Sequence, residues 1–230
     1  MKFADDADLL VPEHTDTDLT LEFQNLLSWS EVNKLPLNLF KKKEIVFHKP
    51  SPKLHIFPPP LDSIERVHIA KFLGVTLTDN LRFSHHVDAI ITICRQRMFL
   101  LKSLKHANLQ TSSLHVIFNA LIISMILYAL PSSGGFLTAH DIARIDSMLA
   151  KCFKFGYCAS VVRYSTLLNE SDSSFFKKIR SSSHCLNGLL PPLKPSGHAG
   201  RPRGHPYALP QVQTTLFKKS FLIRCLFNFV

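Results

Sequence analysis

The sequence predicts an α+β protein in which a small antiparallel β-sheet is followed by a mainly α-helical region and a loosely ordered tail. Short apolar runs bounded by turn residues occupy the first 80 residues. Apolar residues recur with the period of an amphipathic helix between residues 84 and 153, and serine, proline and glycine are frequent after residue 170. With 46% apolar and 19% charged residues, the 230-residue chain has the composition of a protein that buries a core, which excludes a wholly disordered protein.

The first strand is expected at the very start of the chain. The apolar run 9–11 follows the adjacent acids Asp5 and Asp6 and is closed by Pro12, as in a strand that leaves a tight acidic turn. The incoming strand of this hairpin is expected to be nearly absent, because only two residues precede Phe3.

A helix and two further strands are expected next. The apolar positions of the helix are Leu19, Phe23, Leu26 and Leu27. This spacing predicts an amphipathic helix of about four turns, capped within residues 16–18 and ending near Asn33 ahead of Pro36. Short strands are predicted at 44–47 and 67–77, and the proline-rich segment between them is a loop.

Three helices are predicted in the middle of the chain. The first begins at Ser84 as its N-cap, and its apolar face consists of Val87, Ile90, Ile91, Cys94, Met98, Leu101 and Leu104. The second covers roughly residues 112–130 and is apolar on most sides, so it is expected at the centre of a bundle. The third runs from Thr138 to Phe153, with Gly156 just past its end. From Ser171 onward we expect a loosely ordered linker and then a short apolar terminal helix or strand.

Charge is distributed unevenly along the chain, whose formal net charge is +10. Residues 1–31 contain eight acids and one lysine, a net −7, whereas the remaining 199 residues contain 26 bases and nine acids, a net +17. An acidic start on a strongly basic body indicates a polyanionic partner, most simply nucleic acid.

Several features indicate an intracellular protein of the nucleus or cytoplasm. The five cysteines are odd in number and lack a Cys-x-x-Cys pair, which is typical of a reducing compartment. No signal peptide is expected, since the N-terminus lacks a basic segment leading into an apolar run. The run 116–130 is fifteen residues long, short of the roughly 20 that span a bilayer, so it predicts a buried helix and no transmembrane segment. A membrane-associated helical protein built on this run is kept as an alternative.

The adjacent acids Asp5 and Asp6 suggest metal chemistry. Two carboxylates in a tight turn between strands are what a two-metal nucleotidyl-transfer site needs, because Mg²⁺ prefers hard oxygen ligands and a pair of ions clamps the attacking and leaving oxygens. Taken alone, Asp5, Asp6 and Asp8 are more typical of a solvated acidic N-terminus than of a metal site.

Five blocks resemble, in order, the C-terminal part of non-LTR (LINE-type) retrotransposon reverse transcriptases. Phe3-Ala4-Asp5-Asp6 matches the aromatic-Ala-Asp-Asp box of that family. Trp29 and then Leu37-Asn38, Lys41 and Lys43 resemble its Trp…Leu-x-x-Asn-x-x-Lys-x-Lys element. Phe72-Leu73-Gly74-Val75, followed by Leu81, Phe83 and His86, is similar to its primer-grip box. Leu127-Tyr128-Ala129-Leu130-Pro131 is similar to its tyrosine-containing thumb segment, and residues 201–207 and 217–221 resemble its closing region.

The resemblance implies a division of the chain and roles for particular residues. Residues 1–80 would be the end of a polymerase palm, 81–160 a helical thumb and 161–230 a low-order linker with a C-terminal segment. Asp5 and Asp6 would hold Mg²⁺ or Mn²⁺, and Lys41 and Lys43 would lie near the nucleotide phosphates, although a solvated basic turn is the alternative. Phe72, Leu73 and Gly74 would form the turn that grips the primer 3′ end, where glycine permits close approach. The partners implied are an RNA template and a DNA primer, or their hybrid.

The family pattern is incomplete. A further palm aspartate, a Gln-Gly template box and the fingers have no counterpart in the sequence, and Pro131-Ser132-Ser133 stands where relatives carry Pro-x-Trp. We therefore expect a fragment of an RNA-directed DNA polymerase that is inactive alone. The alternative is a non-catalytic, basic nucleic-acid-binding remnant.

The basic residues of the predicted thumb are candidates for phosphate contacts. They are Arg95, Arg97, Lys102 and Lys105 on one helix, and Lys151 and Lys154 on another. Each taken singly is equally typical of a solvated helix face, and the net +17 favours the phosphate role. Zinc is not expected, because Cys152, Cys158, His184, Cys185, His198 and His205 lack the close ligand pairs of structural zinc sites. A serine hydrolase is not supported, because no Gly-x-Ser-x-Gly element exists.

Overall fold

The computed structural model describes most of the chain. The described residues are 2–3, 6–13, 15–35, 37–38, 42–48, 57–61, 64–194 and 204–229. They form two compact units, Met1–Ala70 and Lys71–Val230. Described residues of the expected thumb and of the expected tail belong to the same unit, Lys71–Val230.

The first unit contains short strands and one helix. Strands β1 (Lys2–Phe3) and β2 (Asp6–Ala7) pair antiparallel, whereas β3 (Lys43–Glu44) and β4 (Glu65–Arg66) pair parallel. Arg66 donates from Nε and Nη2 to the two carboxylate oxygens of Glu44 at 2.9 and 3.0 Å, which ties β4 to β3. The mixed α+β class is thus confirmed, but the expectation that the strands form one antiparallel sheet is wrong.

Helix α1 (Leu19–Val32) confirms the predicted helix and its ends. The Asp18 side chain accepts a hydrogen bond from the Thr20 amide at 2.8 Å, and Asn33 is the C-cap. The predicted strand over 9–11 does not form, and Leu10 is 77% exposed. Among the described residues of the first unit no apolar side chain is buried.

A hairpin spans the boundary between the two units. Strands β5 (Ile69–Phe72) and β6 (Val75–Thr78) pair across a two-residue connection, which makes them antiparallel. Leu73 and Gly74 have φ values of +43° and +83°, as a type I′ turn requires at both central positions. The single strand predicted for residues 67–77 is therefore two strands and a turn.

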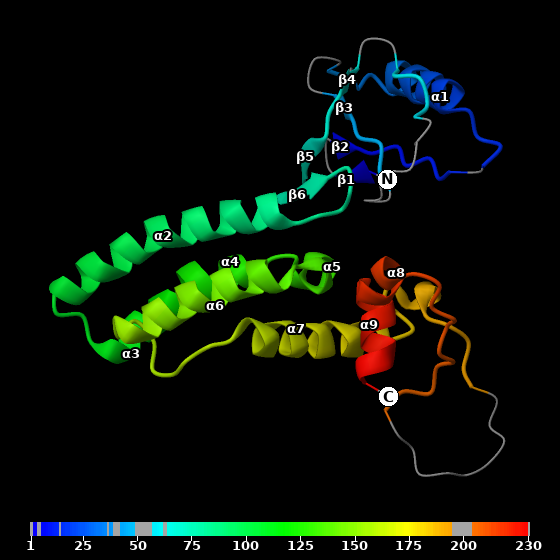
Figure 1. Ribbon diagram of the computed structural model, residues 1–230. Helices are drawn as coiled ribbons and strands as arrows, with labels where there is room; N and C mark the ends of the chain where they lie inside the picture. The colour runs from blue at the N-terminus through cyan, green and yellow to red at the C-terminus, as the bar shows by residue number, and fades with distance from the viewer. Residues whose placement is uncertain are drawn as a thin grey trace. The chain divides into compact units, whose positions relative to one another are not determined.

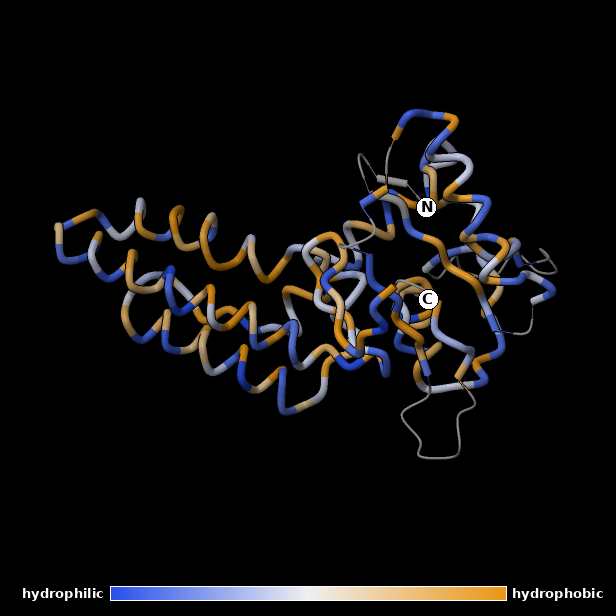
Figure 2. Tube along the Cα trace, turned by 90° about the horizontal axis from the view of Figure 1, so that it is seen from above, coloured by the Kyte–Doolittle hydropathy of each residue, from blue (hydrophilic) through white to orange (hydrophobic). Residues whose placement is uncertain are grey.

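Long helices form the body of the second unit (Figure 1). Helix α2 (Ser84–His106) buries Val87, Ile90, Ile91, Cys94 and Leu101, which confirms the predicted apolar face. Helix α6 (Ala139–Lys154) packs against it. Apolar and polar residues alternate along these helices (Figure 2), and the buried apolar residues belong to one core cluster.

Helix α6 also confirms the predicted C-terminal glycine. Gly156 has φ +69°, its amide donates to Phe153 O at 2.8 Å, and the Tyr157 amide donates to Cys152 O at 3.0 Å. This pair of bonds is a Schellman motif, in which glycine takes the left-handed position at no steric cost.

The apolar helix predicted over residues 112–130 is interrupted. It consists of α3 (Thr111–Phe118), a π-helical turn at Asn119–Ile123 and α4 (Ser124–Leu127), and it breaks at Tyr128–Ala129 before α5 (Leu130–Ser133). The break follows from Pro131, which has no amide to donate to Leu127. A 3₁₀ turn at Gly134–Phe136 follows.

This segment contributes only one face to the core. Leu114, Phe118, Ile122 and Ile126 are buried, whereas Val116 is mostly exposed, so the expectation of a fully central helix is only partly met. Within the described ranges, Thr111–Phe136 is the single segment with the length and hydropathy of a membrane-spanning helix. One such candidate is weak evidence for a membrane span, because the core helix of a soluble protein can have the same length and hydropathy, so the expected absence of a transmembrane segment stays a prediction.

The expectation of a low-order tail is wrong for residues 164–179, which form helix α7 (Tyr164–Ile179). Burial of Tyr164, Leu167, Phe176 and Ile179 outweighs the weak helix propensity of the serines in this segment. The C-terminal helices α8 (Thr215–Lys219) and α9 (Phe221–Asn228) follow, and α9 packs against α7 around a second apolar cluster (Figure 1).

A buried ion pair joins α9 to the rest of the second unit. Arg224 donates from Nε and Nη2 to the two carboxylate oxygens of Asp172 at 2.7 and 2.8 Å, and from Nη2 to Pro131 O at 3.1 Å. Gly135 makes room for the guanidinium, because a Cβ at this position would lie 1.9 Å from Arg224 Nη1.

Candidate nucleic-acid interface

Two of the blocks singled out in the sequence meet in the second unit. The Tyr128 hydroxyl donates a hydrogen bond to Leu73 O at 2.7 Å, across 55 positions of the chain. A Cβ at Gly74 would lie 3.0 Å from Tyr128 Cε1, so only a glycine lets the aromatic ring pack this closely on the turn. The turn and the tyrosine, which is 52% exposed, therefore form one surface feature.

The helix break aims Tyr128 at the turn. Tyr128 is extended, with ψ +121°, and Ala129 is left-handed, with φ +52°. Side chains and amides of α5 satisfy the carbonyl freed by this geometry: Ser132 Oγ donates to Ala129 O at 2.7 Å, and the Ser132 amide donates at 3.1 Å. An uninterrupted helix would point Tyr128 elsewhere, so the proline determines where this hydroxyl lies.

The hairpin is also held by the start of α2. The Thr76 amide is 3.4 Å from His86 Nδ1, which makes the imidazole nitrogen the acceptor of a long hydrogen bond. Burial, and secondly the charge of Lys71, lowers the pKa of His86, consistent with a neutral ring in this position. Thr78 closes the strand end by donating to Arg82 O at 2.7 Å.

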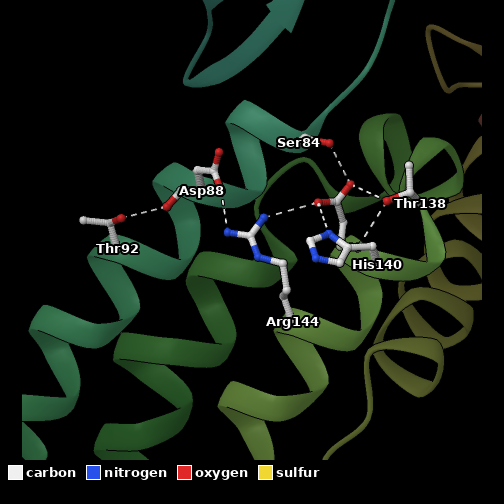
Figure 3. Close-up of polar contacts among 7 residues, drawn as sticks. Ser84, Asp88, Thr92, Thr138, His140 and Arg144 are labelled. Atoms are coloured by element: carbon white, nitrogen blue, oxygen red, sulfur yellow. Dashed lines mark hydrogen bonds and ion pairs between the residues drawn. The ribbon is translucent and has the colours of Figure 1, made fainter.

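A buried carboxylate fixes α2 against α6 (Figure 3). Ser84 Oγ and Thr138 Oγ1 donate to Asp141 Oδ2 at 2.8 and 2.7 Å, and Arg144 bridges Asp141 to Asp88. Burial raises the pKa of Asp141, but the hydrogen bonds from Thr138 and Ser84, with the charge of Arg144, outweigh it and hold that pKa below its usual value. The prediction that Ser84 caps α2 is wrong, since its hydroxyl is used in this contact between helices.

The six predicted phosphate contacts divide into two groups. Four side chains are exposed and make no hydrogen bond or ion pair with a described residue: Arg95, Lys102, Lys151 and Lys154. Arg97 Nη1 instead donates to Leu121 O at 2.6 Å, a carbonyl in the π-helical turn. Lys105 Nζ donates to Phe155 O at 2.6 Å and so caps the end of α6.

Two of the four predicted catalytic residues lie outside the part of the chain that the structure describes. Asp5 and Lys41 lie outside the described residues, and Asp6 is placed only as a strand residue opposite Phe3. Lys43 is an exposed residue of β3. Its neighbour Lys42 places Nζ 4.8 Å from the centre of the Phe23 ring, and burial lowers the Lys42 pKa.

The metal prediction is likewise untested. In the part of the chain that the structure describes, no group of three or more His, Cys, Asp and Glu side chains is arranged to hold a metal ion. Because Asp5 is not among these residues, Mg²⁺ binding by Asp5 and Asp6 stays a prediction.

One exposed residue beside these cations was not among the functional residues predicted from the sequence. Phe99 lies on α2 with 67% of its surface exposed, four residues after Arg95 and three before Lys102. Its position outside the apolar face of α2 was the available signal, because an aromatic residue on a solvent face needs a reason to be there.

Comparison with known proteins leaves the family open, since no family model, curated protein or solved structure matches this chain.

Proposed function

We propose that the chain is the C-terminal part of a reverse transcriptase of the non-LTR retrotransposon type and contributes the last part of its palm, its thumb and its tail. The contact between Tyr128 and the Leu73–Gly74 turn carries this proposal. The resemblance assigned the turn to a primer grip and the tyrosine to a thumb, and a primer grip must be held firmly if it is to position a 3′ end.

The first unit supports the same proposal. Its described residues bury no apolar side chain, while Leu10, Leu21 and Val32 are strongly exposed. Exposed apolar side chains of this kind are stabilised when another part of a protein covers them. Further palm and finger segments would supply such a cover.

The catalytic role depends on residues outside this surface. Asp5 and Asp6 would hold Mg²⁺ or Mn²⁺, which would stabilise the charge that develops in nucleotidyl transfer. Two adjacent aspartates leave most of the octahedral ligand set unfilled. We therefore expect no template-dependent nucleotide incorporation by these 230 residues alone, and incorporation that Asp5→Ala abolishes would contradict this part of the proposal.

Binding to an RNA–DNA hybrid tests the primer-grip assignment. The wild-type chain should bind a hybrid with a recessed DNA 3′ end more tightly than a blunt hybrid of the same length. Tyr128→Phe removes one hydrogen bond to the turn, and such a bond contributes about 0.5–1.5 kcal/mol. Its loss should therefore reduce the preference for the recessed hybrid about two- to tenfold. Tyr207→Phe is the control, because no described hydrogen bond involves its hydroxyl.

The second candidate function is a non-catalytic nucleic-acid-binding protein. The observation that favours it is the distribution of charge, since residues 89–140 contain no acid while Arg95 and Lys102 are exposed and unpaired among the described residues. Such a protein would bind blunt and recessed hybrids equally. Equal binding of both hybrids, unchanged in Tyr128→Phe, would therefore refute the primer-grip assignment and favour this candidate.

A further inference from the structure

Four residues form a narrow stripe along the distal half of α2. They are Arg95, Phe99, Lys102 and His106. Their spacing of four, three and four residues places them on one face of the helix, and all four are exposed. The stripe is about 16 Å long at the rise of an α-helix, and Phe99 has a cation within about one turn on either side.

This face is electrostatically uniform. Residues 89–140 contain no aspartate or glutamate. The acid on the same face, Asp88, is engaged by Arg144 of α6. From the helix packed against α2, the C-terminal turns contribute Lys151 and Lys154, which are also exposed. The stripe therefore presents positive charge around an exposed phenyl ring, and an anionic ligand is the complementary one.

From this arrangement we infer that the α2 stripe binds single-stranded nucleic acid, with an unpaired base stacked on Phe99 and flanking phosphates paired with Arg95 and Lys102. An aromatic ring between cations suits a single strand, whose bases offer free faces for stacking. A duplex keeps its bases stacked on one another and offers the protein mainly phosphates, so it gains little from the phenyl ring. The inference rests on the proposed function only in that the ligand is nucleic acid.

Three variants separate stacking from hydrophobic contact. Phe99→Leu keeps the apolar character of the side chain and removes its π-face, whereas Phe99→Trp keeps the π-face. Leu100→Ala is the matched control, because Leu100 is 51% exposed on the same helix but lies off the stripe. Both positions are solvent-exposed, and circular dichroism melting should show that the three variants fold as the wild type does.

The measurement is fluorescence anisotropy with a labelled strand of about 12 thymidines, within the range that one single-strand-binding fold covers. Phe99→Leu should weaken binding about 5- to 150-fold, the effect of losing one stacked base. Phe99→Trp should bind at least as tightly as the wild type, and Leu100→Ala should stay within about twofold of it. Lys102→Gln should reduce the slope of log affinity against log salt concentration by about 0.7.

Each alternative occupant gives a different result. If Phe99→Leu binds the single strand as tightly as the wild type, the inference is overturned. If Phe99→Leu weakens binding to a blunt RNA–DNA hybrid as much as binding to the single strand, the inference is overturned in favour of a duplex-binding surface. Binding to phosphatidylserine vesicles that survives Phe99→Leu, without binding to the strand, would overturn it in favour of a membrane. If the wild type binds hybrid but not single strand, this inference alone fails, and if it binds neither, the proposed function fails with it.

Discussion

Removing the charge of Asp172 should destabilise the packing of α9, the C-terminal helix, in the second unit. Asp172 is 2% exposed and accepts two hydrogen bonds from Arg224, whose side chain is 11% exposed. Asp172→Asn keeps the shape of the side chain but leaves the guanidinium without its counter-charge in a site that water barely reaches. Because Arg224 also donates to Lys219 O and Pro131 O, the buried cation cannot move away without breaking further bonds.

The size of the effect follows from this geometry. Each hydrogen bond to a charged group contributes about 1.5–3 kcal/mol, and breaking a buried ion pair by removing one partner costs about 3–5 kcal/mol. We therefore expect the free energy of unfolding of the second unit to fall by about 3–5 kcal/mol. The exposed pair of Arg144 and Asp88 provides the control: Asp88 is 53% exposed, so Asp88→Asn should cost at most about 1 kcal/mol.

Urea unfolding followed by far-ultraviolet circular dichroism measures both variants, because helices dominate the second unit. A double-mutant cycle with Arg224→Met adds a second criterion. Asp172→Asn with Arg224→Met should be less destabilised than the sum of the single variants by at least about 1 kcal/mol, since the second change removes the unpaired charge. If Asp172→Asn costs no more than Asp88→Asn, or if the single effects simply add, the reasoning is refuted.

Three further predictions concern Asp141, the cysteine thiols and Gly74. Because the pKa of Asp141 in the folded protein lies below 3.8, the ionised carboxylate stabilises the fold fully above about pH 4, and this stabilisation is lost as the pH falls through the folded pKa. The difference in unfolding free energy between the wild type and Asp141→Asn, measured by urea unfolding, should therefore shrink from neutral pH toward pH ~3. Burial raises the pKa of Cys94 to about 11 and the pKa of Cys152 and Cys225 to about 12. Only the exposed Cys185 should therefore react with a thiol reagent in the native protein. Rapid reaction of all five thiols without denaturant would contradict this prediction. Gly74→Ala should lower the melting temperature, because its φ of +83° and the Tyr128 ring both oppose a Cβ, and an unchanged melting curve would contradict the close approach.

The parts of the fold that could be predicted depend on interactions within a few residues. The N-cap at Asp18 and the Schellman motif at Gly156 are formed by hydrogen bonds between neighbours in sequence. The buried face of α2 follows from a strict apolar period. In each case the sequence contains both partners of the interaction, close together.

The predictions that failed concern interactions between distant segments. The serines within α7 resemble a linker, yet Asp172 among them accepts its partner from 52 residues away. Likewise Ser84 has the position of a helix cap, but Asp141 offers its hydroxyl a buried acceptor on another helix. Arg97 and Lys105 each donate to a backbone carbonyl that the sequence does not indicate, and their phosphate contacts stay a prediction.

By itself, the sequence determined the helical periods, the caps at Asp18 and Gly156, the uneven charge and the order of the motif blocks. Only the tertiary structure decided that the Leu73–Gly74 turn meets Tyr128, that Arg224 closes α9 onto α7, and that Arg95 and Phe99 are free to meet a ligand. The physical reason is that a side chain has a fixed capacity to donate, accept or stack, whereas its partner depends on which distant segments the packing of the core brings within hydrogen-bonding distance.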